Sequence, residues 1–267
     1  MRALEELTER LLDVVRSTMG AGDAPDPTSL SFLLLRYHAT DEPALGETLG
    51  AALAAALARY PDLHSTPDRV ASLTLFADAT ALSDDERLRD AAIDLANALM
   101  RDATDRSSPA DTASIVDACL RTGDASLIPD AVDLLESVVS AHYEPGEGMA
   151  GGTLADQVRS AGALLTAFDA TGRLPYAMLA EELMRTAQRQ RLDDAPFADA
   201  CDAARVLCRL AKLHQDDAYR ASAVLAVDAD YRADAERILS FLSSTHTMHG
   251  ADAARYGLAL AEYSNLK

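Results

Sequence analysis

The spacing of apolar side chains predicts helices along nearly the whole chain. One helix face repeats every three to four residues at Leu127, Ile128, Ala131, Leu134, Leu135, Val138 and Val139. Leu4, Leu7 and Leu11 form the same stripe near the N-terminus. Ser108-Pro109 has the N-cap and first-turn proline of a helix start, and no alternating β-branched run of useful length occurs. The pattern therefore predicts an all-α fold.

A short phrase that ends a helix recurs along the chain. Its copies are Tyr37-His38-Ala39-Thr40-Asp41, Ala77-Asp78-Ala79-Thr80-Ala81, Cys119-Leu120-Arg121-Thr122-Gly123, Phe168-Asp169-Ala170-Thr171-Gly172 and, more weakly, Lys212-Leu213-His214-Gln215-Asp216. Their fourth residues, at positions 40, 80, 122, 171 and 215, lie 40 to 49 residues apart. A period of this size is typical of stacked helical hairpins, with the phrase at the turn within each pair.

These turns divide the chain into pairs of helices. First helices are predicted to begin near Thr28, Thr66, Ser108, Thr153, Phe197 and Gly250, and second helices near Pro43, Asp84, Ser126, Pro175 and Ala218. The first helix of the sixth pair, predicted to begin near Gly250, has no second helix after it in the sequence. The helix from Arg2 to Met19 has an apolar stripe that must pack against another helix. We therefore predict a closed (α/α)6 toroid, a single domain over residues 1–267, which the N-terminal helix completes. The segment 217–245 is predicted to hold two helices, with a break near 228–230.

The charge of the chain changes which partners are expected. Asp and Glu number 43 against 24 Lys and Arg, for a formal net charge of −19. Nucleic acids and anionic membranes are excluded as partners, because both require clustered basic residues. Adaptation to concentrated salt and genome composition are both open as sources of the acid excess.

The cysteines, the start of the chain and its longest apolar stretch indicate the cellular compartment in which the protein is expected. The three Cys residues do not form a disulfide framework. The acidic start of the chain does not resemble a signal peptide, and the longest Ala/Leu stretch, Leu49 to Ala58, is too short to span a bilayer. A cytoplasmic protein is expected.

The second half of the chain resembles a known helical domain. The resemblance covers residues 115–265 and rests on the phrases Leu154-Ala155-Asp156-Gln157, Ala163 to Gly172, Tyr176 with Ala180, Ala204 to Ala211, Ala218-Tyr219-Arg220 and Ala253 to Leu260. They resemble the C-terminal domain of thioredoxin-domain-containing proteins of the spermatogenesis-associated type. That domain is similar to the six-hairpin toroids of glycosidases and N-acylglucosamine 2-epimerases, so the resemblance implies a toroid with a central site. The chain has no Cys-x-x-Cys, so redox chemistry is not carried over, and no cofactor is expected.

The loop 143–152 is the Gly-rich segment of the chain. Gly146, Gly148 and Gly151 match the string G-x-G-x-x-G, but a dinucleotide fingerprint follows a strand, and a helix is predicted here. A nucleotide site is therefore not predicted.

Four polar residues lie close together in sequence where this loop meets the first helix of the fourth pair, at the expected rim of the toroid. Glu144, Glu147 and Asp156 are candidate catalytic acids, since glycosidases use paired carboxylates, and Gln157 is a candidate binding residue. The alternative is an ordinary solvated loop.

Two further groups of residues are candidates for the site. His246 and His249 precede the first helix of the sixth pair. His249 is a candidate catalytic base, and His246, Arg255 and Tyr256 are candidates for substrate binding. A pair of His residues alone does not define a metal site, and none is predicted. Asp199 and Asp202 share one helix face with Arg205 and either line the funnel or form a charge ladder on the surface.

Two functions remain open from the sequence. The first is a toroid that binds or acts on a carbohydrate or a sugar-like small molecule. The second is a non-catalytic helical-repeat scaffold for a protein partner. A cavity with converging polar groups favours the first, and a centre filled by apolar side chains favours the second.

Overall fold

The computed structural model describes residues 2–103, 108–190, 195–222 and 228–266, and these are mostly helical. The helices are α1 (Arg2–Gly20), α2 (Pro27–Thr40), α3 (Pro43–Arg59), α4 (Thr66–Thr80), α5 (Glu86–Asp102), α6 (Pro109–Arg121), α7 (Ile128–His142), α8 (Leu154–Thr171), α9 (Leu174–Arg189), α10 (Phe197–Leu213), α11 (Asp217–Ser222), α12 (Tyr231–Leu242) and α13 (Ala253–Ser264). The short elements are η1 (Tyr60–Asp62), η3 (His246–Asp252), β1 (Tyr143–Glu144) and β2 (Gly148–Met149), and the two strands pair antiparallel. The prediction of an all-α fold is confirmed.

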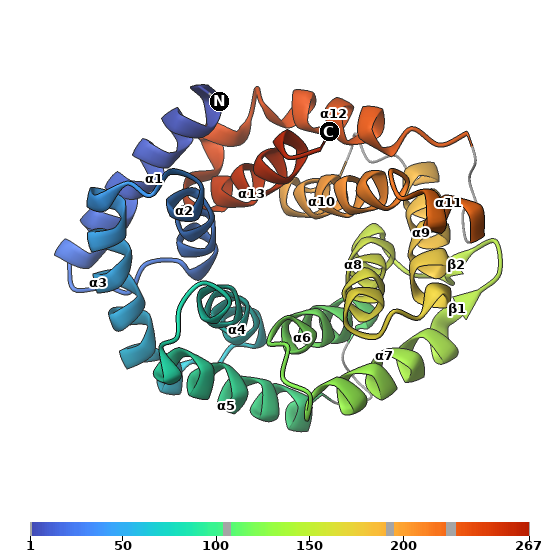
Figure 1. The fold of residues 1–267 in the computed structure, drawn as a ribbon, viewed down its shortest axis with the longest axis horizontal. Helices are drawn as coiled ribbons and strands as arrows, with labels where there is room; N and C mark the ends of the chain where they lie inside the picture. Colours follow the sequence, from blue (N-terminus) through green and yellow to red (C-terminus); the bar gives the residue numbers. More distant parts are fainter. Residues whose placement is uncertain (1, 104–107, 191–194, 223–227, 267) are drawn as a thin grey trace.

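The helices lie in two concentric layers (Figure 1). The inner layer consists of α2, α4, α6, α8, α10 and α13, and each contacts the next, with α13 returning to α2. The outer layer consists of α1, α3, α5, α7, α9 and α12, each packed on an inner helix. One face of each inner helix therefore points toward the centre of the molecule.

Local sequence explains where these helices begin. Ser65, Ser108 and Thr153 each accept a hydrogen bond from the backbone N–H three residues later, and so cap α4, α6 and α8. Proline stands in the first turn of many of the helices, where its missing N–H leaves no bond unmade. The predicted helix starts agree with the observed ones to within three residues, and the predicted break before Tyr231 is also observed.

The buried apolar side chains form one continuous cluster between the two layers. The stripe of α1 takes part in it, because Leu4, Leu7 and Leu11 are buried where α1 contacts α13 and α2. The first and last helices of the chain are thus packed together. Among the described helices, none is long and apolar enough to cross a membrane.

The contact of α13 with α1 and α2 depends on a residue without a side chain. A Cβ atom at Gly257 would lie 2.6 Å from a ring carbon of the buried Phe32 and 2.8 Å from Cδ2 of Leu7. We expect Gly257→Ala to lower the free energy of unfolding by about 1–3 kcal/mol, since overpacking displaces neighbours that have no free space. Urea unfolding measures the change.

A matched substitution isolates the packing effect at Gly257. Gly50 lies exposed in the outer helix α3, where an added Cβ atom would meet no neighbouring group within 4 Å. Gly50→Ala should leave stability unchanged or raise it by up to about 1 kcal/mol, because alanine is the better helix former. Equal effects of the two substitutions would show that close packing is not what requires glycine at position 257.

Candidate functional site

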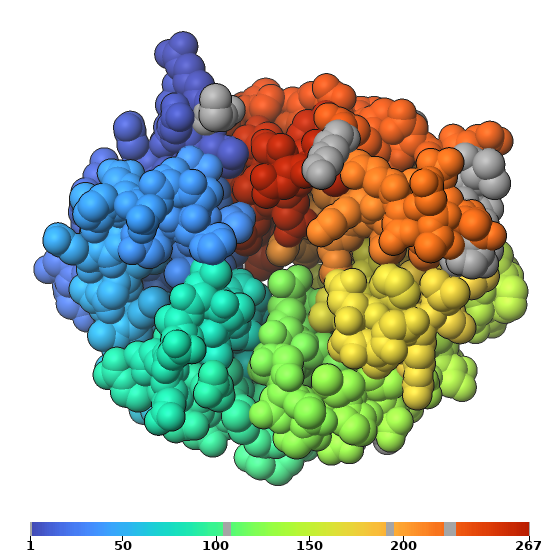
Figure 2. Space-filling view, in the orientation of Figure 1, coloured from blue at the N-terminus to red at the C-terminus, as the bar shows by residue number. Residues whose placement is uncertain are grey.

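A cavity of about 350 Å³ occupies the centre of the inner layer. The space-filling view shows the surface hollowed at this point (Figure 2). All six inner helices contribute to its wall, which includes Thr28 and Ser31 of α2, Thr74 and Asp78 of α4, Asp111, Ser114, Asp117 and Arg121 of α6, Arg159 and Gly162 of α8, Asp202, Arg205 and Arg209 of α10, and Arg255 and Leu258 of α13. The wall thus contains five Arg and four Asp residues, so charges of both signs converge on the cavity.

Polar residues at helical spacing place these groups in the cavity. Ser114, Asp117 and Arg121 follow the i, i+3, i+7 spacing of one face of α6, whose other faces are buried among apolar side chains. Asp202, Arg205 and Arg209 form the corresponding stripe on α10. Each hairpin buries its apolar residues between the two layers, so the polar stripe of each inner helix faces the centre of the molecule.

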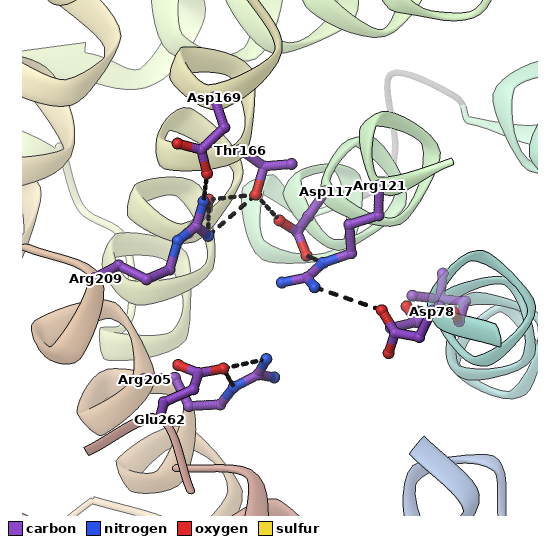
Figure 3. A network of polar contacts seen from close by, with 11 residues as sticks. Asp78, Asp117, Arg121, Thr166, Asp169, Arg205, Arg209 and Glu262 are labelled. Atoms are coloured by element: carbon purple, nitrogen blue, oxygen red, sulfur yellow. Dashed lines mark hydrogen bonds and ion pairs between the residues drawn. The ribbon is translucent and has the colours of Figure 1, made fainter. Parts of the chain in front are cut away.

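One end of the cavity holds a network of ion pairs and hydrogen bonds (Figure 3). Arg121 Nε donates to Asp117 Oδ2 at 2.8 Å, and Arg121 Nη1 lies 3.9 Å from Asp78 Oδ1. The Thr166 hydroxyl donates to Asp117 Oδ1 at 2.5 Å, and Arg209 Nη1 donates to the same hydroxyl oxygen at 3.1 Å. The network joins α4, α6, α8 and α10 across the cavity.

The two carboxyl groups beside Arg121 have pKa values displaced in opposite directions. Burial is the largest influence on Asp117 and raises its pKa, but Arg121, Arg209 and the Thr166 hydrogen bond outweigh burial and lower the pKa to about 2. Burial also dominates at Asp78 and leaves its pKa above the ordinary value, despite attraction by Arg121 and Arg205. Asp117 therefore stays ionised, whereas Asp78 holds a proton more readily than an exposed carboxyl group does.

A second charged cluster lines the cavity nearer the first turns of α8, α10 and α13. Arg159 Nη2 donates to Asp199 Oδ1 at 3.2 Å, and Arg159 Nε lies 3.9 Å from Asp202 Oδ2. Arg255 Nη1 lies 3.6 Å from Asp202 Oδ1. Burial, the largest influence, raises the pKa of Asp202 above its ordinary value, although three Arg residues oppose it. Of the two positions left open for Asp199 and Asp202, the structure gives Asp202 a place in the cavity wall, together with Arg255, and Asp199 contacts the wall through Arg159.

Glu144 and Glu147 do not lie where the sequence analysis expects them. Both are exposed on the β1–β2 hairpin, which lies outside the ring beside α9 (Figure 1). The hairpin is held there by Glu182 of α9, which accepts hydrogen bonds from the Tyr143 hydroxyl at 2.8 Å and the Gly146 N–H at 2.9 Å. Neither Glu144 nor Glu147 lines the central cavity, so the expectation that they form its rim is corrected.

Asp156 and Gln157 are buried and bonded to backbone groups. Asp156 Oδ2 accepts from the Thr153 N–H at 2.8 Å, and its Oδ1 accepts from the Ala110 N–H at 2.9 Å. It thereby caps the start of α8 and satisfies a donor at the start of α6. Gln157 accepts from the Met149 N–H at 2.9 Å and donates to the Met149 carbonyl at 2.8 Å. Neither side chain lines the cavity, because both are occupied in fixing local backbone.

The two predicted histidines stack on different aromatic rings. His246 stacks on Tyr256 with ring centroids 4.6 Å apart, and His249 stacks on Phe197 with centroids 3.7 Å apart. His246, His249 and Tyr256 lie outside the cavity wall. Within the described part of the chain, no group of three or more His, Cys, Asp or Glu residues is arranged to hold a metal ion.

The three cysteines are free thiols buried in the apolar cluster. Burial raises the pKa of Cys119, Cys201 and Cys208 to about 12, so each stays a thiol near neutral pH.

Sequence reasoning misses most of the cavity wall. Asp78, Asp117, Arg121 and Arg209 are not among the predicted site residues, although each interrupts an apolar inner helix near its C-terminal end. The signal is present as polar residues that share one face of a helix otherwise buried. It identifies the face of each helix, but not which faces meet.

Comparison with protein families and with curated proteins gives no relative from which a function could be transferred. No protein-family model matches the chain, and a search of curated proteins finds no significant match. The function therefore has to be inferred from the cavity itself.

Proposed function

We propose that the chain is a single-domain (α/α)6 toroid whose central cavity binds a small carbohydrate-like molecule. The observation that carries the proposal is the convergence of five Arg and four Asp side chains on one cavity of about 350 Å³. Small-molecule sites of this size commonly combine a concave wall with a few converging polar groups. The contact of α13 with α2, which closes the sequence of inner-helix contacts, supports the toroid. The resemblance to six-hairpin toroids supports it independently of the cavity.

The chemistry of the wall is suited to a ligand rich in hydroxyl groups. Carboxylates of Asp accept hydrogen bonds from hydroxyl groups, and guanidinium groups of Arg donate to hydroxyl oxygens. The described wall contains no aromatic ring, so the ligand would be held by hydrogen bonds and charge and not by stacking. Asp78 and Asp117, with pKa values displaced in opposite directions, are the pair of carboxyl groups best suited to act as acid and base.

A scaffold for a protein partner is the alternative, and it receives less support. A scaffold needs no open centre lined by charged groups, and it commonly presents a contiguous apolar surface to its partner. The large apolar side chains exposed on the described residues are Val14, Leu82, Phe241 and Met248, which belong to four different segments. The open, charged centre favours a small ligand.

Filling the cavity without breaking an ion pair tests the proposal. Gly162 lines the cavity on α8, and a Cβ there would meet only Val206, at an ordinary contact distance of 3.6 Å. We expect Gly162→Leu to abolish binding of sugars that shift the melting temperature of the wild type. The helix itself should tolerate the change, because leucine favours helix more than glycine does. A thermal-shift screen of neutral and acidic sugars, followed by calorimetric titration, measures binding.

The control is Gly50→Leu, an exposed site on the outer helix α3. It should bind the same sugars as the wild type. Equal binding by Gly162→Leu and wild type would refute a site in the central cavity. Absence of binding by the wild type to every sugar in the screen would favour the scaffold.

A further inference from the structure

Two guanidinium groups enter the cavity from different helices. Arg121 comes from the last turn of α6 and Arg205 from the middle of α10, and both belong to the cavity wall. Figure 3 shows the two groups extending into the same open space, with Asp117 and Asp78 beside Arg121 and Glu262 beside Arg205. Positive charge from two directions therefore meets in one part of the cavity.

Each of these guanidinium groups is anchored on one side and has donors left over. Arg121 makes its hydrogen bond through Nε, to Asp117. Arg205 directs Nε and Nη2 to a single oxygen, Glu262 Oε1, at 2.8 and 2.7 Å. A guanidinium group carries five N–H donors, and among the described residues no further hydrogen bond of these two side chains is found. Anchored side chains with spare donors are preorganised to bind a ligand.

The two cations also influence each other. Burial is the largest influence on Arg205 and lowers its pKa, Glu262 raises it, and the charge of Arg121 lowers it again, for a net value above the ordinary one. The two guanidinium groups are therefore close enough to repel. An anion placed between them would relieve that repulsion, and its oxygens would accept hydrogen bonds from both guanidinium groups.

The geometry points to an anion subsite in the cavity, at which Arg121 and Arg205 together bind the carboxylate or phosphate group of an acidic sugar. This inference rests on the proposed function, and it narrows the ligand from carbohydrates in general to those that carry an oxyanion. The remaining polar groups of the wall, such as Asp202 and Ser114, would bind the hydroxyl groups.

The test compares each neutral hexose with the matching hexuronate and hexose 6-phosphate, and adds inorganic phosphate as a probe without a sugar. Calorimetric titration of the wild type should show at least tenfold tighter binding of one acidic form than of its neutral counterpart. The variant Arg205→Gln with Glu262→Gln removes both members of an ion pair, so it leaves no unpaired carboxylate. It should lose most of the preference, because it weakens binding of the acidic form more than binding of the neutral hexose.

The matched control removes an ion pair that is not part of the cavity wall. Arg69 Nη1 lies 2.6 Å from Asp102 Oδ2, between α4 and α5. The variant Arg69→Gln with Asp102→Asn should keep the full preference for the acidic sugar. Should the first variant fail to fold, Arg121→Gln with Asp117→Asn tests the same subsite from the side of α6.

The outcomes separate this inference from the proposed function. Binding of neutral hexoses with no preference for the acidic forms would overturn the anion subsite and leave the proposed function standing. Binding of inorganic phosphate that the Arg205→Gln, Glu262→Gln variant loses, without binding of any sugar, would support the subsite and overturn the carbohydrate function. Preference that persists in both cavity variants would place the anion elsewhere. The relative affinities for the hexuronate and the 6-phosphate identify the anionic group.

Discussion

Asp117→Asn is expected to lower the free energy of unfolding at pH 7 by about 2–3 kcal/mol, and the melting temperature by roughly 5 °C. The Asp117 carboxylate is bonded to Arg121 and Thr166, and its pKa is lowered from 3.8 to about 2. Because the folded state prefers the ionised form, the stabilisation is fully present above pH 3.8 and is lost as the pH falls toward about 2. The difference between wild type and variant should therefore shrink across this interval. Urea unfolding at several pH values measures it.

Asp78→Asn is the matched control, since Asp78 faces the same Arg121. Burial raises the pKa of Asp78, so folding disfavours its ionised form relative to the unfolded chain, and the charge contributes no net stability near neutral pH. We expect the free energy of unfolding at pH 7 to change by less than about 1 kcal/mol. Equal losses in the two variants, or a loss in Asp117→Asn that does not depend on pH, would contradict the assignment of opposite roles to the two carboxyl groups.

The second large effect is expected at Glu181, which lies outside the cavity. Its side chain is fully buried in α9, and Oε1 lies 3.0 Å from His214 Nε2 and 2.9 Å from the Tyr231 hydroxyl. Burial first, then the charge of Glu181, raises the pKa of both Tyr219 and Tyr231. Glu181 thus joins α9 to the end of α10 and to α12.

Glu181→Ala should cost about 3–5 kcal/mol in the free energy of unfolding, because it removes the acceptor of His214 and of the buried Tyr231 hydroxyl and creates a void. Glu181→Gln keeps one amide oxygen as acceptor and should cost less than half as much. The adjacent Glu182→Ala is the control: it also loses two hydrogen bonds, to Tyr143 and Gly146, but in a partly solvated place. Its cost should stay below about 1.5 kcal/mol. A cost for Glu181→Ala no greater than that for Glu182→Ala would show that the buried junction is not a stability determinant.

Neither of these two sites was identifiable from the chain alone. Asp117 has the spacing of an exposed i, i+4 pair with Arg121, which looks the same in sequence as a surface ion pair. Glu181 stands beside Glu182 in a helix rich in charged residues, and only its contacts with His214 and Tyr231 in the folded protein distinguish the buried residue from its neighbour. Burial, which sets the energy of both sites, is a property of the assembled helices.

The β1–β2 hairpin is a second case in which the local sequence did not predict where a segment lies in the fold. A Gly-rich loop with two Glu residues before an inner helix has the composition of an active-site loop. Its position depends on Glu182, 38 residues after Glu144, whose carboxylate binds the hairpin on the outer layer. A contact of that sequence separation leaves no local signal.

The sequence by itself determined the helices, their pairing and their buried faces. Apolar spacing, N-cap residues and first-turn prolines act over a few residues, so a linear pattern contains them. Only the tertiary structure decided which polar residues meet, because the cavity joins Asp78, Asp117, Arg205 and Arg255 from helices distant along the chain. The orientation of each inner helix follows from how its apolar face packs against the outer layer and its two neighbours. That packing turns separate polar stripes into one site, and it leaves the Gly-rich loop outside.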